Sequence, residues 1–202
     1  MKLVGRMLSP FVRRVAATLN LYGMEWESWP LSTATDMAEI MRVNPVGRVP
    51  VLFLDGGEAL VDSAAIIDHL DEVAGDAALT PRSGAERRQV MQAVAIGLGA
   101  ADKTVAALYE GQRRPEALRW PEGLEKLLGQ AAGGFRALDS MLDGRQHLAL
   151  GRLTQADVTA AIAYDFACTV MPEWAAGLAP RLAELRDRLN ADARVGGTRF
   201  TG

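Results

Sequence analysis

The sequence predicts an α/β N-terminal part with the element order βαβαββα, followed by an all-helical C-terminal part. Short apolar runs bounded by turn residues alternate with helical spacing through the first third of the chain. Residues 76–84 then show no periodicity and contain glycine, proline and serine, which indicates a linker. Only helical spacing follows. We therefore expect an α/β domain at 1–75, the linker at 76–84 and a helical domain at 85–202.

The first segment predicts a strand, a helix and a second strand. Residues 2–8 are largely apolar, and residues 24–29 alternate between apolar and polar side chains. Between them, Ser9 suits the N-cap of a helix and Pro10 suits its first helical position. The helix ends at Gly23, and its apolar stripe consists of Val12, Val15, Ala16 and Leu19.

A second, shorter helix is expected at residues 33–43, and the turn-rich stretch 44–50 ends it. Residues 51–54 and 59–61 then predict a hairpin, because an Asp-Gly-Gly turn lies between two short apolar runs. Pro50 should occupy the first position of its strand, since proline cannot donate a ladder hydrogen bond. A third helix, begun by Asp and Ser caps at 62–63, completes the order βαβαββα.

The C-terminal part predicts helices throughout. Residues 86–111 are alanine-rich and amphipathic, and residues 118–142 carry leucines at helical spacing. Thr154 and Asp157 form a capping-box variant, with Asp in place of Glu or Gln. The helix that they begin is apolar on nearly every side, so we expect it to be the buried centre of this domain. A last amphipathic helix is expected at residues 180–189.

Composition narrows the class of partner. The 202 residues include 22 basic and 25 acidic side chains, and a net charge of −3 gives no reason to expect nucleic acid or a membrane surface. Cys168 is the only cysteine, so no intrachain disulfide can form, and we expect an inert core thiol. The N-terminus lacks the apolar core of a signal peptide, and no run reaches the ~18 apolar residues that cross a bilayer. We expect a cytoplasmic protein.

The histidines and paired arginines have simple structural interpretations. His69 lies on a helix face and is expected to be structural, whereas His147 lies in a loop and is expected to be solvated. Their spacing fits no metal-ligand pattern, so we expect no metal site. The arginine pairs at 13–14 and 113–114 are expected to be solvated helix charges, with a buried ion pair as the alternative for Arg13.

Four motifs in register resemble the cytosolic glutathione S-transferase family. They are Ser9-Pro10-Phe11-Val12-Arg13 at the first helix start, Val49-Pro50 before the third strand, Asp62-Ser63 at the third helix start, and the Thr154-to-Asp157 cap. Each motif alone is weak, but together they follow the family's order along the whole chain. The resemblance implies a thioredoxin-like N-terminal domain, a helical-bundle C-terminal domain, a homodimer and a cis bond before Pro50.

The resemblance also implies glutathione as co-substrate, bound by Phe11, Arg48, Val49, Pro50, Asp62 and Ser63. The Val49 backbone would hold the cysteinyl part of the tripeptide as an added antiparallel strand. Asp62, where the family often has Glu, would pair with the glutamyl ammonium, and Ser63 would bind the neighbouring carboxylate at the helix N-terminus. Arg48 suits the glycyl carboxylate. The alternatives are plain helix capping at 62–63 and a solvated loop charge at 48.

Ser9 is the expected catalytic residue. Its Ser-Pro-Phe context resembles omega-like and several bacterial family members, which activate glutathione near the first helix start. The hydroxyl would donate to the sulfur and, with the helix dipole, favour the thiolate. Lowering a thiol pKa from ~8.5 to ~7 requires about 2 kcal/mol, which one charge-assisted hydrogen bond and a helix N-terminus can supply. The alternative is that Ser9 only caps its helix.

Serine at position 9 disfavours thiol-disulfide exchange, because that chemistry needs a nucleophilic sulfur there. Glutaredoxin, dehydroascorbate-reductase and glutathione-lyase activities are therefore not expected. The resemblance implies a glutathione transferase that conjugates a small hydrophobic electrophile. Candidates for the electrophile pocket, by position only, are Met7, Leu8, Phe11, Tyr109, Arg113 and Trp120.

Two alternative functions stay open at this point. One is a non-catalytic module of the same fold that binds glutathione or another protein, since function depends on the site rather than on the fold. The other is a glutathione-dependent isomerase, although the double-serine and cysteine signature of the zeta-like isomerases is missing near Ser9.

Overall fold

The computed structural model describes residues 1–201, and their contacts divide the chain into two units. Unit 1 comprises Met1–Leu79 together with the residues from Leu189 onwards, and unit 2 comprises Thr80–Arg188. The residues from Leu189 onwards contact unit 1 only in the folded chain, so domain boundaries drawn along the sequence could not express this grouping. The boundaries 1–75, 76–84 and 85–202 stay a prediction about which parts of the chain fold on their own.

Unit 1 has the predicted order βαβαββα. Its elements are β1 (Lys2–Val4), α1 (Pro10–Leu21), β2 (Glu27–Trp29), α2 (Met37–Val43), β3 (Val51–Phe53), β4 (Ala59–Val61) and α3 (Ser63–Ala74), followed by the short 3₁₀ turn η1 (Gly75–Ala77). The first two strands are shorter than expected. β1 ends at Val4 because Gly5 has a φ of +126°, which leaves the strand conformation.

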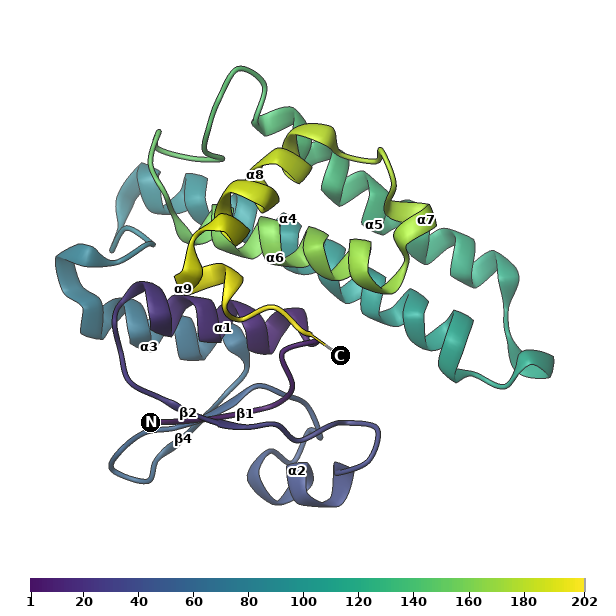
Figure 1. Ribbon diagram of the computed structural model, residues 1–202, viewed down its shortest axis with the longest axis horizontal. Helices are drawn as coiled ribbons and strands as arrows, with labels where there is room; N and C mark the ends of the chain where they lie inside the picture. The colour runs from purple at the N-terminus through teal and green to yellow at the C-terminus, as the bar shows by residue number, and fades with distance from the viewer. Residues whose placement is uncertain (202) are drawn as a thin grey trace. The chain divides into compact units, whose positions relative to one another are not determined.

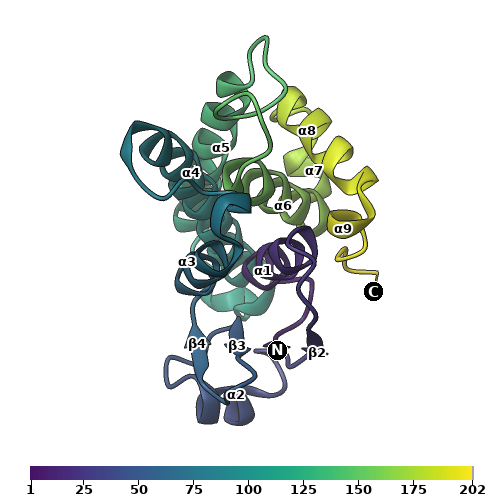
Figure 2. The same cartoon turned by 90° about the vertical axis from the view of Figure 1, so that its left-hand side faces the viewer.

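The four strands form one mixed sheet in the order β2-β1-β3-β4. β1 pairs with β2 in parallel and with β3 in antiparallel register, and β3 pairs with β4 in antiparallel register. Helices α1 and α3 cover one face of this sheet and α2 covers the other, as Figures 1 and 2 show. This arrangement confirms the expected thioredoxin-like N-terminal domain.

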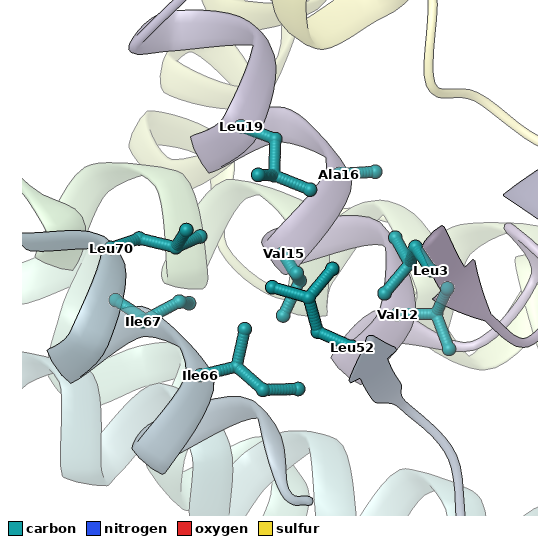
Figure 3. Close-up of a cluster of buried hydrophobic side chains, with 9 residues drawn as sticks. All are labelled: Leu3, Val12, Val15, Ala16, Leu19, Leu52, Ile66, Ile67 and Leu70. Atoms are coloured by element: carbon teal, nitrogen blue, oxygen red, sulfur yellow. The ribbon is translucent and has the colours of Figure 1, made fainter. Parts of the chain in front are cut away.

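The core of unit 1 follows from the pleat of the sheet. Leu3 and Leu52 oppose each other across β1 and β3 and point to the face that α1 and α3 cover. There they pack with apolar side chains of both helices (Figure 3), namely Val12, Val15, Ala16, Leu19, Ile66, Ile67 and Leu70. The next residue of β1, Val4, points to the other face and packs with Ile40 of α2.

Unit 2 is helical, as expected. Its elements are α4 (Gly84–Leu108), the π-helical turn η2 (Tyr109–Arg113), the 3₁₀ turn η3 (Glu116–Leu118), α5 (Pro121–Met141), α6 (Gln155–Val170), α7 (Pro172–Ala175) and the larger part of α8 (Pro180–Ala191). Helix α4 packs against both α5 and α6. Every residue of α6 from Gln155 to Ala167 is buried, in agreement with its apolar sequence. A further short helix, α9 (Ala193–Gly196), belongs to unit 1.

The start of α6 is held by a buried carboxylate. Asp157 accepts hydrogen bonds from the backbone N–H of Thr154 at 2.8 Å and of Leu148 at 2.8 Å. Burial raises the pKa of Asp157, and these hydrogen bonds act in the opposite direction. His147, expected to be solvated, is half-buried with its Nδ1 at 3.7 Å from Asp157 Oδ1. That expectation was wrong, because the cap folds the loop onto the helix.

None of the helices in residues 1–201 combines the length and the apolarity needed to cross a membrane.

Gly5 provides a test of the packing in unit 1. A Cβ at this position would overlap Cγ2 of Val12 and lie 3.0 Å from Cβ of Val49, at a φ that disfavours any side chain. We expect Gly5→Ala to lower the free energy of unfolding by about 2–4 kcal/mol in urea denaturation. The control is Gly23→Ala, whose φ is +66° but whose Cβ would meet nothing within 4 Å. It should cost only about 1–2 kcal/mol. Equal losses in the two variants would contradict this explanation.

Candidate active site

Ser9 caps α1, as the sequence predicts. Its hydroxyl accepts a long hydrogen bond of 3.4 Å from the backbone N–H of Val12, and Pro10 occupies the first turn of the helix. The backbone N–H of Ser9 donates to the carbonyl of Arg6 at 3.0 Å. The Ser9 side chain is half-buried. A hydroxyl in this position can both cap the helix and donate its proton to a bound group.

A buried asparagine organises the loop before β3. The Asn44 side chain donates to the carbonyl of Arg48 at 2.8 Å and accepts from the N–H of Val46 at 3.0 Å. Asn44 is buried, so these hydrogen bonds fix the loop from inside. The loop leads into the Val49–Pro50 peptide bond, which is cis. The residues predicted for the site do not include Asn44, although an asparagine before a Pro-x-Gly turn is a known turn signal.

Gly5 and Phe11 bring this loop to the start of α1. The absence of a side chain at Gly5 lets Val12 of α1 and Val49 approach the loop after β1 closely. On the same side, the Arg48 guanidinium lies 5.9 Å from the centre of the Phe11 ring. Exposed cation-π contacts of this kind contribute about 0.5–1 kcal/mol. Four of the predicted glutathione-site residues, at 11 and 48–50, therefore adjoin one another.

Asp62 and Ser63 begin α3 as predicted. Asp62 has a φ of +68° and its Oδ1 accepts from the N–H of Ala64 at 3.0 Å, so it caps the helix. Asp62 is exposed, whereas Ser63 is buried. The first N–H groups of a helix lack partners within the helix and attract anions. The pair thus places a carboxylate next to an anion-binding helix end.

Arg14 connects α1 to this helix end. Its Nη1 donates to Ser63 Oγ at 3.2 Å, and its side chain is only 2% exposed. Burial lowers the pKa of Arg14 to about 10, against the opposing effect of the Asp62 and Asp71 carboxylates, so the guanidinium stays charged at neutral pH. Its Nε is buried and has no hydrogen-bond partner within residues 1–201. A buried cation is therefore hydrogen-bonded to Ser63 and interacts electrostatically with Asp62.

The expectation that arginines 13 and 14 are solvated was wrong. Both are buried, and Arg13 donates to Asn190 Oδ1 at 2.7 Å and to Thr198 Oγ1 at 3.3 Å. A signal for this was present in the sequence. Between Val12 and Leu19 the helix has only two arginines and one threonine among apolar residues, so it has no continuous polar face to turn towards water.

The predicted electrophile-pocket residues fall into two groups. Met7, Leu8 and Phe11, all half-buried, lie in unit 1, the first two in the loop after β1 and Phe11 in the first turn of α1. The others lie close together in the sequence of unit 2, where the Arg113 guanidinium is 4.1 Å from the centre of the Tyr109 ring. Trp120 is 63% exposed, and its backbone N–H donates to Glu110 Oε1 at 2.7 Å. Their role as one pocket stays a prediction.

Other reactive side chains form no obvious site. Cys168 is half-buried, its sulfur lies 3.1 Å from Nη1 of Arg186, and burial raises the pKa of its thiol. Residues 1–201 contain no group of three or more His, Cys, Asp or Glu side chains placed to hold a metal ion.

Comparison with known proteins supports the family that the motifs indicate. Residues 3–78 match the family described as glutathione S-transferase, N-terminal domain. The chain is 30% identical over 196 residues to an uncharacterized GST-like protein, YibF, of Escherichia coli K12, covering 94% of this chain and 93% of that protein. The chain belongs to the glutathione S-transferase family. This membership confirms the family to which the four sequence motifs pointed.

Solved structures of the family extend the similarity to the whole fold. A glutathione S-transferase of Methylobacillus flagellatus KT, whose structure contains bound glutathione, superposes with a TM-score of 0.90 at 27% identity, covering 98% of each chain. The chain is also 35% identical over 156 residues to a maleylacetoacetate isomerase of Rhizobium meliloti, covering 71% of this chain and 68% of the isomerase. Transferases and an isomerase therefore both occur among its relatives.

The Asn44 hydrogen bonds can be tested directly. Asn44→Ala removes one donor and one acceptor from a buried loop, and we expect the free energy of unfolding to fall by about 2–3 kcal/mol in chemical denaturation. Thr35→Ala, which removes an exposed hydrogen bond to Asp36 nearby, serves as the control and should change it by at most about 0.5 kcal/mol. A loss for Asn44→Ala no larger than the control's would contradict the assigned role.

Proposed function

We propose that this protein is a glutathione transferase that activates the thiol of glutathione at Ser9 for attack on a small hydrophobic electrophile. The observation that carries the proposal is the gathering of three motifs around the first half of α1. The Arg48 guanidinium lies over the Phe11 ring, and the lack of a side chain at Gly5 lets Val49 approach closely. Arg14 donates a hydrogen bond to Ser63. Family membership and the related structure with bound glutathione support glutathione as the ligand.

Glutathione carries three groups that these motifs can recognise. The Val49 backbone would pair with its cysteinyl peptide group as an added strand. Its γ-glutamyl end has an ammonium, which suits the exposed Asp62 carboxylate, and a carboxylate, which suits the N-terminus of α3 at Ser63. The buried Arg14 cation would add positive charge behind that carboxylate and hold the Ser63 hydroxyl in place. Arg48 would pair with the glycyl carboxylate.

The chemical step requires the thiol to lose its proton near neutral pH. Ser9 would donate its hydroxyl proton to the sulfur in a hydrogen bond that strengthens as the thiolate forms, and the N-terminus of α1 adds its positive dipole. These contributions match the about 2 kcal/mol that a pKa near ~7 requires. The thiol proton would pass to solvent water, the thiolate would attack the electrophile to form a carbon–sulfur bond, and the leaving group would depart with the electron pair of the bond that breaks. Met7, Leu8, Tyr109, Arg113 and Trp120 remain the proposed contacts for the electrophile.

A glutathione-dependent isomerisation is the second candidate. The relative from Rhizobium meliloti named maleylacetoacetate isomerase favours it. Both reactions begin with a bound thiolate and differ in whether the sulfur leaves again. A screen of electrophiles and of cis-configured unsaturated acids, each with glutathione, would separate them. Isomerised acid without a stable conjugate would identify the isomerase, whereas glutathione binding without either product would indicate a non-catalytic module.

A homodimer and a cytoplasmic location belong to the same proposal. The family resemblance implies the homodimer, and the single cysteine of the chain is the reason to expect the cytoplasmic location. Sedimentation analysis and fractionation of the native host would test them.

Ser9→Ala tests the catalytic role. Loss of the hydroxyl should raise the pKa of the bound thiol and reduce kcat at pH 6.5 by about tenfold to a hundredfold. The free energy of unfolding should fall by about 1 kcal/mol, because the cap is also lost. The control is Ser83→Ala, at the N-cap of α4, where the serine side chain makes no capping hydrogen bond. Unchanged turnover in Ser9→Ala, with glutathione still bound, would leave Ser9 as a helix cap only.

Asp62→Asn tests the glutamyl contact separately from helix capping. Asparagine keeps an acceptor for the Ala64 N–H and tolerates the positive φ, but it loses the charge. We expect the dissociation constant of glutathione, measured by calorimetry, to rise by about tenfold or more, with little change in the melting temperature. Glu72→Gln, which removes an exposed charge from the same helix, is the control for net charge. Equal affinity in wild type and Asp62→Asn would reject the contact.

A further inference from the structure

The C-terminal residues of unit 1 lie along α1, and we define residues 190–200 as the C-terminal strap. Figures 1 and 2 show α9, within the strap, beside α1. Near the end of α1, Asn20 Nδ2 donates to the carbonyl of Arg194 at 2.9 Å. In the first half of α1, Arg13 Nε donates to Thr198 Oγ1 at 3.3 Å. Beyond the start of α1, the Arg6 guanidinium lies 5.3 Å from the centre of the Phe200 ring.

These contacts give the strap a direction. As the strap runs from 194 to 200, its partners run backwards from the last turn of α1 to the loop before it. From residue 194 onwards the strap is therefore antiparallel to α1, and residue 200 lies at the loop that leads into Ser9.

The C-terminal strap is held to unit 1 by buried side chains and hydrogen bonds. Val195 and Thr198 are buried, and Arg13 is 5% exposed. Thr198 Oγ1 donates a hydrogen bond to the carbonyl of Val195 at 2.6 Å and accepts one from Arg13. The hydroxyl therefore acts as both donor and acceptor. Gly196 lies so close to the carbonyl of Asn190 that no side chain could fit there without movement. These contacts fix the position of Thr198 relative to α1.

The end of the strap is coupled to Ser9 through the backbone. The carbonyl of Arg6 accepts a hydrogen bond from the N–H of Ser9 at 3.0 Å, and the side chain of the same arginine rests on Phe200. Arg13 is four residues beyond Ser9 and its N–H donates to the Ser9 carbonyl at 2.9 Å. Arg6, which contacts Phe200, and Arg13, which contacts Thr198, thus both form hydrogen bonds with the Ser9 backbone.

We propose that Thr198 and Phe200 are positioning residues for Ser9. Their contacts hold Arg13 and Arg6, and these two arginines fix the position of the Ser9 hydroxyl relative to the thiol of bound glutathione. The proposal rests on the proposed role of Ser9 in activation. A hydrogen bond to a developing thiolate depends steeply on distance and direction, so small shifts of a catalytic hydroxyl reduce its effect. The residues proposed to bind glutathione at 48–50 and 62–63 do not include these two positions, so thiol activation should change more than affinity.

The experiment compares four variants of the full chain. Thr198→Val removes the hydroxyl at nearly constant volume, and Thr198→Ser restores it. Phe200→Ala removes the ring over Arg6. Arg194→Ala is the matched control, because its side chain lies in the same strap but pairs with Asp192. For each variant the pKa of the bound thiol is measured by ultraviolet absorption of the thiolate across pH, together with kcat, the dissociation constant of glutathione and the melting temperature.

We expect Thr198→Val and Phe200→Ala to raise the pKa of the bound thiol by about half a unit or more and to lower kcat at pH 6.5 by about threefold to tenfold. The dissociation constant should stay within about twofold of wild type. Thr198→Ser and Arg194→Ala should match wild type in thiol pKa. A lower melting temperature with an unchanged thiol pKa in Thr198→Val and Phe200→Ala would overturn the proposal and leave the strap purely structural.

The wild-type titration separates this proposal from the one on which it rests. If wild type forms no thiolate with bound glutathione, activation by Ser9 fails, and positioning by the strap fails with it. If wild type forms the thiolate and the strap variants form it at the same pH, only the strap proposal fails.

Discussion

The enclosure of α1 is the constraint on which unit 1 depends. Every residue from Val12 to Leu19 is buried, including two arginines and a threonine. Burying an unpaired charge or polar group is costly, so each of these side chains needs a partner within the fold. Thr18 donates to a backbone carbonyl one turn earlier, Arg14 donates to Ser63 on α3, and Arg13 donates to the C-terminal strap. The helix is therefore oriented by polar contacts to α3 and to the C-terminal strap.

This constraint also explains how the candidate site is assembled. The motifs at 9–11, 48–50 and 62–63 are far apart in the sequence, and each adjoins the first half of α1. Gly5 permits the closest approach, because a side chain there would collide with Val12 and Val49. A site built in this way against a rigid helix is held more accurately than one built on loops alone.

The same arrangement distinguishes binding from activation. The proposed binding groups lie on the loop before β3 and at the start of α3, whereas the proposed activating hydroxyl lies at the start of α1. A relative that lost only the hydroxyl could still bind glutathione, and one that kept it could conjugate or isomerise different substrates. Function within this family is thus decided by a few side chains on a common fold.

The sequence by itself determined the element order, the caps at Ser9, Asp62 and Thr154, and the family, because these depend on local backbone preferences and on motif order. It also named the positions that the fold brings to α1. It did not reveal that Arg14 stands behind Ser63, nor that the chain returns from residue 189 to lie along α1. Only the tertiary structure decided these, because whether a charged side chain is buried and paired depends on partners that are distant in the sequence and become neighbours only when the chain is folded.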